Sequence, residues 1–428
     1  MKIAVIGGGS TYTPELLEGL IERERRLALE EVVLHDISAQ RLDPVSGFCR
    51  RMAAARGARF RLRDTLDLDD ALDRASFVVL QIRVGGQEAR LRDELRGLRF
   101  GVIGQETTGE GGFAKAVRTI PVALDLARRI RERAPGAFVI NFTNPSGIVT
   151  EALLRFGRVP TVGLCNVPAE MKMEAAKALG VPPEEVELDY VGLNHLGWVR
   201  RIVVQKRDIT EEVIAAFAAG YGPKNVPEVD YGADFFAALR MIPSPYLRYY
   251  YAEDEVLREL GSAAKPRAQV VMEIEQALFS YYRDPTTCEK PALLSERGGA
   301  YYSRVALDVI EGLLSPRPRR EVVNTLNRGA VPGLPDDAVI EIQADLSSHG
   351  VIPVAAGPLP EEIFGLMRQV KAYERLTIEA AITRSRGKAL MALIANPLVR
   401  TVSNARAILD DLVATGDYPM DESPPVEA

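Results

Sequence analysis

Cys165 and His195 carry metal-binding side chains at positions where the sequence suggests a site. Cys165 ends the apolar run Thr161–Cys165, and His195 interrupts a strand-like stretch at 187–204. One thiolate and one imidazole are too few for a structural zinc site, which needs four protein ligands. They could hold a divalent ion and leave positions for water and substrate oxygens, as an open catalytic site requires. Cys165 could equally be a packing residue, and the residue types alone leave both interpretations open.

Other polar residues follow buried strands. Asn144 and Asn166 come directly after the expected strands Phe138–Phe142 and Thr161–Cys165. Ligands of open α/β sheets bind at the carboxyl edge of the strands, so these side chains are candidates for a substrate site. Arg90 and Arg267 could each bind a phosphate, because a guanidinium matches phosphate oxygens in paired hydrogen bonds. Either arginine could also lie on the surface without a function.

Glu106 and Tyr246 are candidates for proton chemistry. Glu106 lies in the glycine-rich segment Gly101–Gly112, which is too long for a turn and is typical of a functional loop. Tyr246 begins the aromatic run Tyr-Leu-Arg-Tyr-Tyr-Tyr. Loop acids are usually solvated and aromatic runs usually pack in a core, so neither residue is assigned a role by its type alone.

The N-terminus predicts a dinucleotide site. A short apolar run at 3–6 precedes Gly7, Gly8, Gly9 and Ser10, and helical spacing begins near Glu15. Strand, glycine turn and helix start form the phosphate-binding part of a βαβ unit. The third glycine of the usual motif is replaced by Tyr12, so a simple tight turn is the alternative.

A second feature of that site is Asp36, at the end of the strand 31–36. An acid at this position accepts hydrogen bonds from the adenosine ribose and disfavours the extra phosphate of NADP, so NAD is the expected cofactor. An ordinary loop aspartate is the alternative.

These residues require a scaffold of alternating strands and helices. Expected strands at 3–6, 31–36, 60–63, 77–81, 138–142 and 161–165 alternate with helical segments, which predicts an N-terminal Rossmann-like, doubly wound parallel sheet. The rhythm changes after residue 165. We expect an NAD-binding domain at 1–166, an α+β catalytic and oligomerisation domain at 167–415, and a disordered tail at 416–428. No linker separates the halves, so the site should lie in their cleft.

Composition excludes several classes of protein. The 428 residues carry a formal net charge of −6, which argues against nucleic acid as a partner. The sequence contains no apolar run of about 18 residues, so we expect no membrane span, and we see no signal-peptide pattern. Three cysteines in so long a chain argue against a disulfide framework and for the reducing cytoplasm.

Taken together, the motifs resemble those of glycoside hydrolase family 4, the NAD-dependent glycosidases, and specifically its 6-phospho-β-glucosidase members. The segments that carry the resemblance are GGGSTYTPEL (7–16), QIRVGGQEAR (81–90), GQETTGEGGF (104–113), NFTNPSGIVTEA (141–152), GLCNVP (163–168), GLNHLGW (192–198), IPSPYLRYY (242–250) and PRAQVVMEIE (266–275). They extend over nearly the whole chain, and the set is specific even where single motifs are not.

The resemblance implies roles for the candidate residues. Cys165 and His195 would bind a divalent metal, usually Mn²⁺. Asn144, Arg90 and Arg267 would contact the substrate, with Arg90 near its phosphate. A homodimer or homotetramer is also implied.

The resemblance further implies that Tyr246 is the base and that Glu106 raises its basicity. The α-glycosidase members carry an aspartate directly after the metal cysteine as proton donor, whereas this chain has Asn166, which we expect to contact substrate. This difference favours the β-specific branch and leaves open which group protonates the leaving oxygen.

The implied reaction explains why the usual pair of facing carboxylates is missing, since this family is an exception to that scheme. NAD would take hydride from C3 of the sugar, Tyr246 would remove the C2 proton, the aglycone would leave from C1, water would add, and the hydride would return. The expected substrate is a 6-phospho-β-glucoside such as cellobiose 6-phosphate. The alternatives are a family member acting on a non-phosphorylated sugar, a lactate/malate-type NAD-dependent dehydrogenase, and a non-catalytic NAD-binding sensor.

Overall fold

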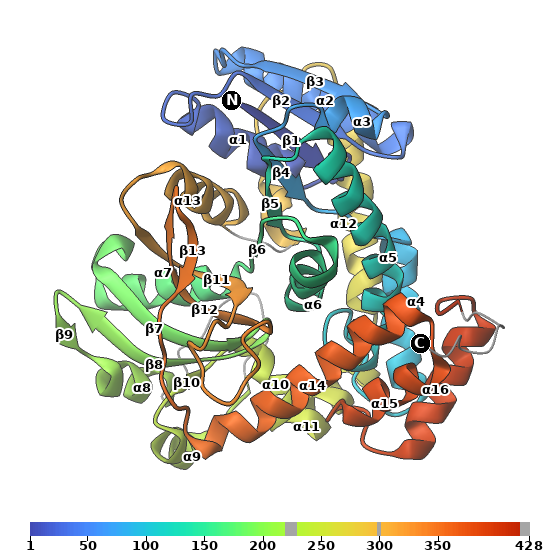
Figure 1. Cartoon of the computed structure of the whole chain (residues 1–428), viewed down its shortest axis with the longest axis vertical. Helices are drawn as coiled ribbons and strands as arrows, with labels where there is room; N and C mark the ends of the chain where they lie inside the picture. Colours follow the sequence, from blue (N-terminus) through green and yellow to red (C-terminus); the bar gives the residue numbers. More distant parts are fainter. Residues whose placement is uncertain (219–228, 298–300, 420–428) are drawn as a thin grey trace.

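The computed structural model describes residues 1–218, 229–297 and 301–419, apart from the side chains of 216–218 (Figure 1). Within these ranges the strands join in one continuous mixed sheet. The strands are β1 Lys2–Ile6, β2 Glu31–His35, β3 Arg61–Thr65, β4 Phe77–Leu80, β5 Phe138–Asn141, β6 Thr161–Gly163, β7 Val186–Leu193, β8 Leu196–Val204, β9 Arg207–Asp208, β10 Ile242–Pro243, β11 Arg319–Leu326, β12 Val339–Ser347 and β13 Gly350–Pro353.

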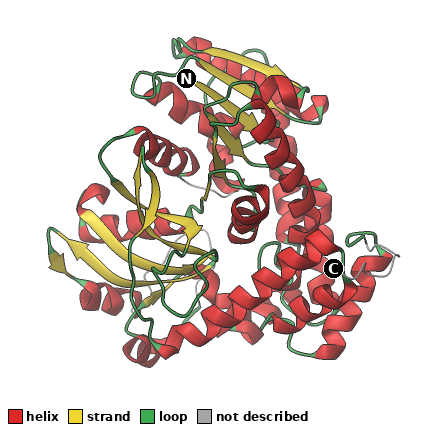
Figure 2. Ribbon diagram, in the orientation of Figure 1, coloured by secondary structure: helices red, strands yellow, loops and turns green. Residues whose placement is uncertain are grey.

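Helices cover the sheet and form the lower right part of the molecule in Figure 2, while strands lie at its lower left. They are α1 Thr13–Arg23, α2 Ala39–Ala55, α3 Leu68–Leu72, α4 Gly86–Arg99, α5 Gly109–Arg133, α6 Ser146–Ala152, α7 Val167–Leu179, α8 Thr210–Ala218, α9 Gly232–Leu239, α10 Arg248–Tyr251, α11 Glu253–Ser262, α12 Arg267–Arg283, α13 Tyr302–Leu314, α14 Glu361–Thr383, α15 Arg386–Ala395 and α16 Val402–Ala414.

The N-terminal half is the expected doubly wound parallel sheet. Its strand order is β6-β5-β4-β1-β2-β3, and every neighbouring pair is parallel. Along β1, Ile3 and Val5 point to one face while Ala4 and Ile6 point to the other, and all four are buried. Burial on both faces accounts for the uninterrupted apolar run that predicted this strand.

The two faces of this sheet are covered by helices from different parts of the chain. One face packs against α1, α2, α12 and α13, and the other against α3, α5 and α6. Two of these helices, α12 and α13, come from the half that we expected to form a separate domain. The two halves therefore pack directly against each other, in keeping with the lack of a linker between them in the sequence.

The C-terminal strands extend the same sheet in antiparallel fashion. β11 pairs with β6 through Asn324 and Gly163, and the order continues β11-β12-β7-β8-β10. β7 and β8 form a hairpin that turns at Asn194 and His195, the polar residues that interrupt this strand-like stretch in the sequence. The parallel strands and this hairpin thus belong to the same continuous sheet.

Two features of the fold differ from the sequence expectation. The glycine-rich segment is a loop only as far as Thr108, because Gly109–Gly112 form the first turn of α5. A Cβ at Gly111 would lie 2.2 Å from the carbonyl oxygen of Gln105, so this glycine permits close packing rather than flexibility. β11 was not predicted.

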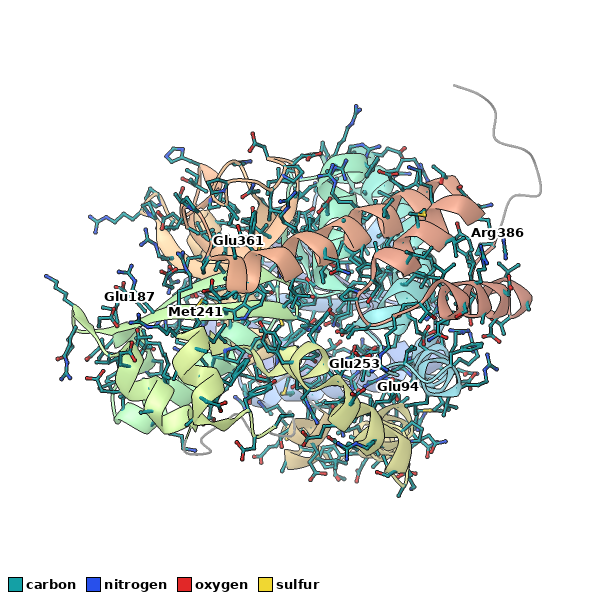
Figure 3. All side chains as sticks on the ribbon, turned by 90° about the horizontal axis from the view of Figure 1, so that it is seen from below. Glu94, Glu187, Met241, Glu253, Glu361 and Arg386 are labelled. Atoms are coloured by element: carbon teal, nitrogen blue, oxygen red, sulfur yellow. The ribbon has the colours of Figure 1, made fainter. Side chains whose placement is uncertain are left out.

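The start of the expected tail is also ordered. Asp417 and Tyr418 are buried, and the Tyr418 hydroxyl donates to the carbonyl oxygens of Ala380 and Ser385. Residues 420–428 lie outside the described residues. In Figure 3, α14 crosses the lower side of the molecule from Glu361 toward Arg386, where α15 begins. No helix among the described residues is long and apolar enough to span a membrane.

Candidate active site

The glycine turn lies at the carboxyl end of β1. Gly7 has a φ of +92°, and a Cβ on it would lie 2.7 Å from the carbonyl oxygen of Gln81, so only glycine fits. The amides of Gly7 and Gly8 both donate to the carbonyl oxygen of His35, at 2.9 and 2.7 Å. The turn is thus fixed between β2 and β4, and its three glycines carry no side chains of their own that would block the close approach of a pyrophosphate.

Asp36 holds the same turn from the end of β2. Its Oδ2 accepts from the amide of Gly9 at 2.9 Å, and its Oδ1 accepts from the amide of Ser38 at 3.1 Å. A Cβ at Gly9 would lie 2.8 Å from Oδ2. The carboxylate therefore stands at the position predicted for a ribose contact, and its orientation is set by two backbone amides.

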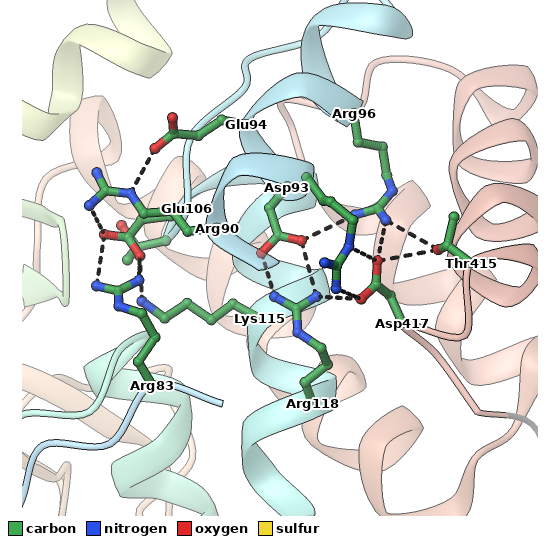
Figure 4. A network of polar contacts seen from close by, with 12 residues as sticks. Arg83, Arg90, Asp93, Glu94, Arg96, Glu106, Lys115, Arg118, Thr415 and Asp417 are labelled. Carbon is green, nitrogen blue, oxygen red and sulfur yellow. Dashed lines mark hydrogen bonds and ion pairs between the residues drawn. The ribbon is translucent and has the colours of Figure 1, made fainter. Parts of the chain in front are cut away.

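Glu106 lies among three cations, which the left part of Figure 4 shows. Arg83 and Arg90 form ion pairs with its carboxylate, the latter at 3.4 Å, and the Lys115 ammonium lies 2.6 Å from Oε2. Burial alone would raise the pKa of Glu106, but the three cations bring it well below its usual range. Burial lowers the pKa of Lys115 to about 7, helped by Arg83 and opposed by Glu106. Glu106 is therefore an ionised, buried acid, not the solvated loop acid of the alternative interpretation.

Arg90 and Arg267 lie near one another on the same side of the site. Arg90 is buried on α4, and its Nε donates to Glu94 Oε1 at 2.8 Å. Arg267, the first residue of α12, donates to the carbonyl oxygens of Glu296 and Arg297. Burial lowers the pKa of Arg267, and the charge of Arg90 lowers it further. Two guanidiniums held this close favour an anion beside them.

Cys165 and His195 both lie beside Tyr246. The imidazole of His195 stacks on the Tyr246 ring with centroids 3.7 Å apart and planes inclined by 12°. Cys165, beyond the end of β6, interacts with the Tyr246 phenol and hydrogen-bonds to the side chain of Asn194. The structure thus brings together three candidates that lie far apart in the sequence.

Burial sets the protonation of this group. It lowers the pKa of His195 to about 3, so the imidazole is neutral at physiological pH. Burial also raises the pKa of the Tyr246 phenol well above its usual value, and Tyr249, Cys165 and Glu106 raise it further, against Arg90. Burial and Glu341 raise the pKa of the Cys165 thiol. Ionisation of the thiol or the phenol therefore needs an additional cation nearby.

The two asparagines at the strand ends differ in their contacts. Asn144 is partly exposed between β5 and α6, where it is available to a ligand. Asn166 precedes α7, and its Nδ2 donates to Glu170 Oε1 at 2.5 Å. Its side-chain amide is therefore already oriented by an acid of the same helix.

Sequence reasoning missed two residues that support the site. Asn194 Oδ1 accepts from the amide of Ser146 at 3.1 Å, and its Nδ2 donates to Glu341 Oε1 at 3.1 Å. Glu341 also accepts from Asn324 at 2.8 Å and from the Tyr190 hydroxyl at 2.9 Å. The available signals were the position of Asn194 directly before His195 and the single acid, Glu341, within the otherwise apolar run 338–342.

The donor set fits an open metal site. Among the described residues, no group of three or more His, Cys, Asp and Glu side chains is placed to hold an ion. Cys165 and His195 would therefore supply two ligands and leave the others to water and substrate oxygens. His195 Nδ1 is engaged by the Thr107 hydroxyl at 2.9 Å, which leaves Nε2 for a metal.

Comparison with known proteins identifies relatives along the whole chain. The profile described as "Family 4 glycosyl hydrolase" matches residues 2–181, and that of "Family 4 glycosyl hydrolase C-terminal domain" matches 190–399. The "Probable 6-phospho-beta-glucosidase" of Bacillus subtilis is 42% identical over 96% of both chains. The "Maltose-6'-phosphate glucosidase" of the same species is 30% identical over 99% of this chain and 98% of its own.

Solved structures agree with these matches. The 6-phospho-beta glucosidase from Thermotoga maritima, solved with manganese, NAD⁺ and glucose-6-phosphate, has a TM-score of 0.89 and 36% identity over 98% of this chain and 99% of its own. Malate dehydrogenase from Plasmodium falciparum has a TM-score of 0.52 at 14% identity, over 89% of this chain and 99% of its own. The latter likeness shows a shared fold only.

Proposed function

The chain belongs to the family 4 glycosyl hydrolases, and we propose that it hydrolyses 6-phospho-β-glucosides such as cellobiose 6-phosphate. The observation that carries this proposal is the convergence of Cys165, His195 and Tyr246 beside a pair of arginines, on the sheet that also holds the glycine turn. A dehydrogenase of the malate type has no need of a tyrosine stacked on a buried histidine beside a cysteine.

The phosphate and the anomeric preference are supported by different residues. Arg90 and Arg267 concentrate positive charge near Tyr246, where a phosphorylated sugar would gain charge-assisted hydrogen bonds. The chain is more similar to the Bacillus 6-phospho-β-glucosidase, at 42% identity, than to the maltose-6'-phosphate enzyme, at 30%. Asn166 also fits the β-specific branch, because the family resemblance implies an aspartate at this position in the α-specific members.

NAD and Mn²⁺ are the cofactors we propose, since the relative of known structure binds both. When bound, NAD takes hydride from C3 of the sugar and later returns it, while the metal polarises the C3 carbonyl. The backbone of Gly7–Ser10 and the carboxylate of Asp36 hold the cofactor, and Cys165 and His195 hold the metal. Asn144 and Asn166 orient the sugar at the strand ends.

Tyr246 performs the proton transfer in this scheme. Its Oη removes the C2 proton, and the aglycone then leaves from C1. Burial and the negative charge of Glu106 raise the pKa of the phenol, so its ionised form is a strong base. Glu106 also holds Arg90 in place through an ion pair.

Hydrolysis in deuterium oxide tests the mechanism. Cleavage of cellobiose 6-phosphate should release glucose 6-phosphate that carries deuterium at C2, measured by mass spectrometry and NMR. Tyr246→Phe should lower kcat by about 10²- to 10⁴-fold, the usual contribution of a general base. Tyr249→Phe, whose ring lies 5.9 Å from that of Tyr246, is the matched control and should remain active.

Two outcomes would overturn the proposal. Product without deuterium at C2 would exclude the elimination route. Net accumulation of NADH with substrate would identify a dehydrogenase instead.

The phosphate contact is tested separately. Arg90→Ala should raise KM for phosphorylated substrate by about 10- to 100-fold, because a hydrogen bond to a charged group contributes about 1.5–3 kcal/mol. An unchanged KM would show that Arg90 is not the main contact of the phosphate. It would favour the alternative that the natural substrate is a non-phosphorylated sugar. We also propose a homodimer or homotetramer, which light scattering coupled to gel filtration would measure.

A further inference from the structure

The loop before α5 makes a chain of hydrogen bonds to His195. Gln105 Oε1 accepts from the amides of Thr107 and Thr108, at 2.5 and 2.7 Å. An amide nitrogen cannot accept these protons, so the two backbone donors establish which end of the Gln105 side chain is the oxygen. The atom that faces Thr107 therefore carries no proton.

Thr107 links this oxygen to the imidazole. Its Oγ1 lies 2.9 Å from Gln105 Oε1 and 2.9 Å from His195 Nδ1. The hydroxyl has one proton to donate, and Gln105 Oε1 can only accept it. If the proton pointed to His195 instead, two oxygens would face each other at 2.9 Å with no hydrogen between them. The Thr107 proton therefore points to Gln105 Oε1. Oγ1 in turn accepts a proton from His195, and that proton lies on Nδ1.

We propose that Gln105 and Thr107 are positioning residues that fix His195 as its Nδ1–H tautomer and so present the lone pair of Nε2 to the metal. This inference rests on the metal site of the proposed function. A metal-binding histidine needs a neutral ring with the lone pair on the correct nitrogen, and the partner of the other nitrogen selects that tautomer. Stacking on Tyr246 fixes the plane of the ring, while the Thr107 contact selects its protonated nitrogen.

The three successive residues Gln105, Glu106 and Thr107 each contact a different part of the structure. Gln105 points back to the backbone of its own loop, Glu106 points to the cations, and Thr107 points to His195. The loop therefore positions a metal ligand and the charged environment of Tyr246 at the same time.

Metal titration tests the proposal in the absence of substrate. Mn²⁺ binding to the purified full chain with NAD present is measured by calorimetry. Thr107→Val keeps the shape of the side chain but removes the acceptor, and we expect about 10- to 100-fold weaker binding, as is usual when a partner of a metal ligand is lost. Thr107→Ser restores the hydroxyl and should bind within about threefold of the original protein.

Thr119→Val is the matched control. Thr119 lies on α5, and its hydroxyl is buried without a hydrogen-bond partner in the described structure, so its removal should leave Mn²⁺ affinity unchanged. Equal affinity of Thr107→Val and the original protein would overturn the proposal, as would equal losses in Thr119→Val and Thr107→Val.

Nitrogen NMR of the metal-free protein provides a test that is independent of catalysis. The chain has three histidines, and His35→Asn and His349→Gln variants assign two of the signals. We expect the shifts of His195 to show a proton on Nδ1 in the original protein and a mixture of tautomers in Thr107→Val. A proton on Nε2 in the original protein would overturn the proposal. Absence of Mn²⁺ binding with the Nδ1–H tautomer present would instead refute the metal site of the proposed function.

Discussion

Helix α4 carries two clusters of charged side chains that differ in how completely their arginines are paired (Figure 4). The site cluster consists of Arg83, Arg90, Glu94, Glu106 and Lys115, and the C-terminal cluster consists of Asp93, Arg96, Arg118, Asp411 and Asp417. Both are largely buried, and both join segments distant in sequence. Only the site cluster lies next to Tyr246.

Arg96 and Arg90 show the difference most clearly. Arg96 uses all three nitrogens, with Nε on Asp411 at 2.7 Å, one terminal nitrogen on Asp93 at 3.1 Å and the other on Asp417 at 2.5 Å. Arg90 pairs through Nε and one terminal nitrogen, and within the described residues its second terminal nitrogen makes no hydrogen bond or ion pair. A fully paired guanidinium stabilises the fold, whereas a partly paired one retains donors for a ligand.

Glu106→Gln should have the largest effect of the changes that test this comparison. The substitution removes the carboxylate that pairs with three cations. Because this carboxylate raises the pKa of Tyr246, its loss makes the phenolate a weaker base. We therefore expect kcat to fall by about 10²- to 10³-fold, the usual loss for one electrostatic partner at a reacting centre. Steady-state kinetics measure this loss.

Glu110→Gln is the control for that change. Burial raises the pKa of Glu110 well above its usual value, and in the described structure neither oxygen has a hydrogen-bond partner, so no charge is removed. Equal losses in both variants would show that the effect is structural.

Asp417→Asn should act on stability instead of catalysis. It breaks buried ion pairs with Arg96 and Arg118 and a half-exposed pair with Arg92, and the free energy of unfolding should fall by about 3 kcal/mol. Chemical denaturation measures this change, and kcat should stay close to that of the original protein. Asp410→Asn, which removes an exposed pair with Arg386, should cost less than about 1 kcal/mol. A large loss of kcat in Asp417→Asn would contradict the division between the clusters.

The same residue predicts a pH dependence. Burial raises the pKa of Asp417, but Arg92 and Arg96 lower it below the usual value, so folding favours the ionised form. Its contribution to stability is fully present above about pH 4, the pKa of an unfolded aspartate, and is lost as pH falls through the folded pKa. The difference in unfolding free energy between the original protein and Asp417→Asn should therefore shrink below about pH 4.

Lys115→Met should change the dependence of stability on pH at the alkaline end of the range. The folded pKa of Lys115 is about 7, whereas an unfolded lysine titrates near 10.4, so between these values the unfolded chain binds one more proton. The original protein should gain stability relative to Lys115→Met as pH rises from 7 toward 10. Denaturation at several pH values measures this slope, and a flat difference would indicate that Glu106 keeps the ammonium charged throughout.

The sequence predicted the parallel strands because their apolar runs are local. β11 was missed because Arg319, Arg320 and Asn324 break its apolar pattern, although its inner residues are buried against a neighbouring strand. The candidate site residues could be identified in the sequence from their places at strand ends and from family motifs. Contacts between distant residues could not be identified in this way. Arg96 and Asp417, for example, are 321 residues apart, and no local pattern reveals their contact. The same is true of Thr107 and His195, which are 88 residues apart.

The pairing of Gly163 with Asn324 also limits how this protein can be recombined. A Cβ at Gly163 would lie 2.2 Å from the Thr150 hydroxyl and 2.9 Å from the Asn324 Cβ, so the seam between the two halves accepts only a matched pair of surfaces. Helices α12 and α13 cross that seam to cover the opposite half. Chimeras that exchange one half between relatives should therefore fail to fold unless both sides of the seam are exchanged together. The two halves therefore form one packing unit, although two separate sequence profiles match them.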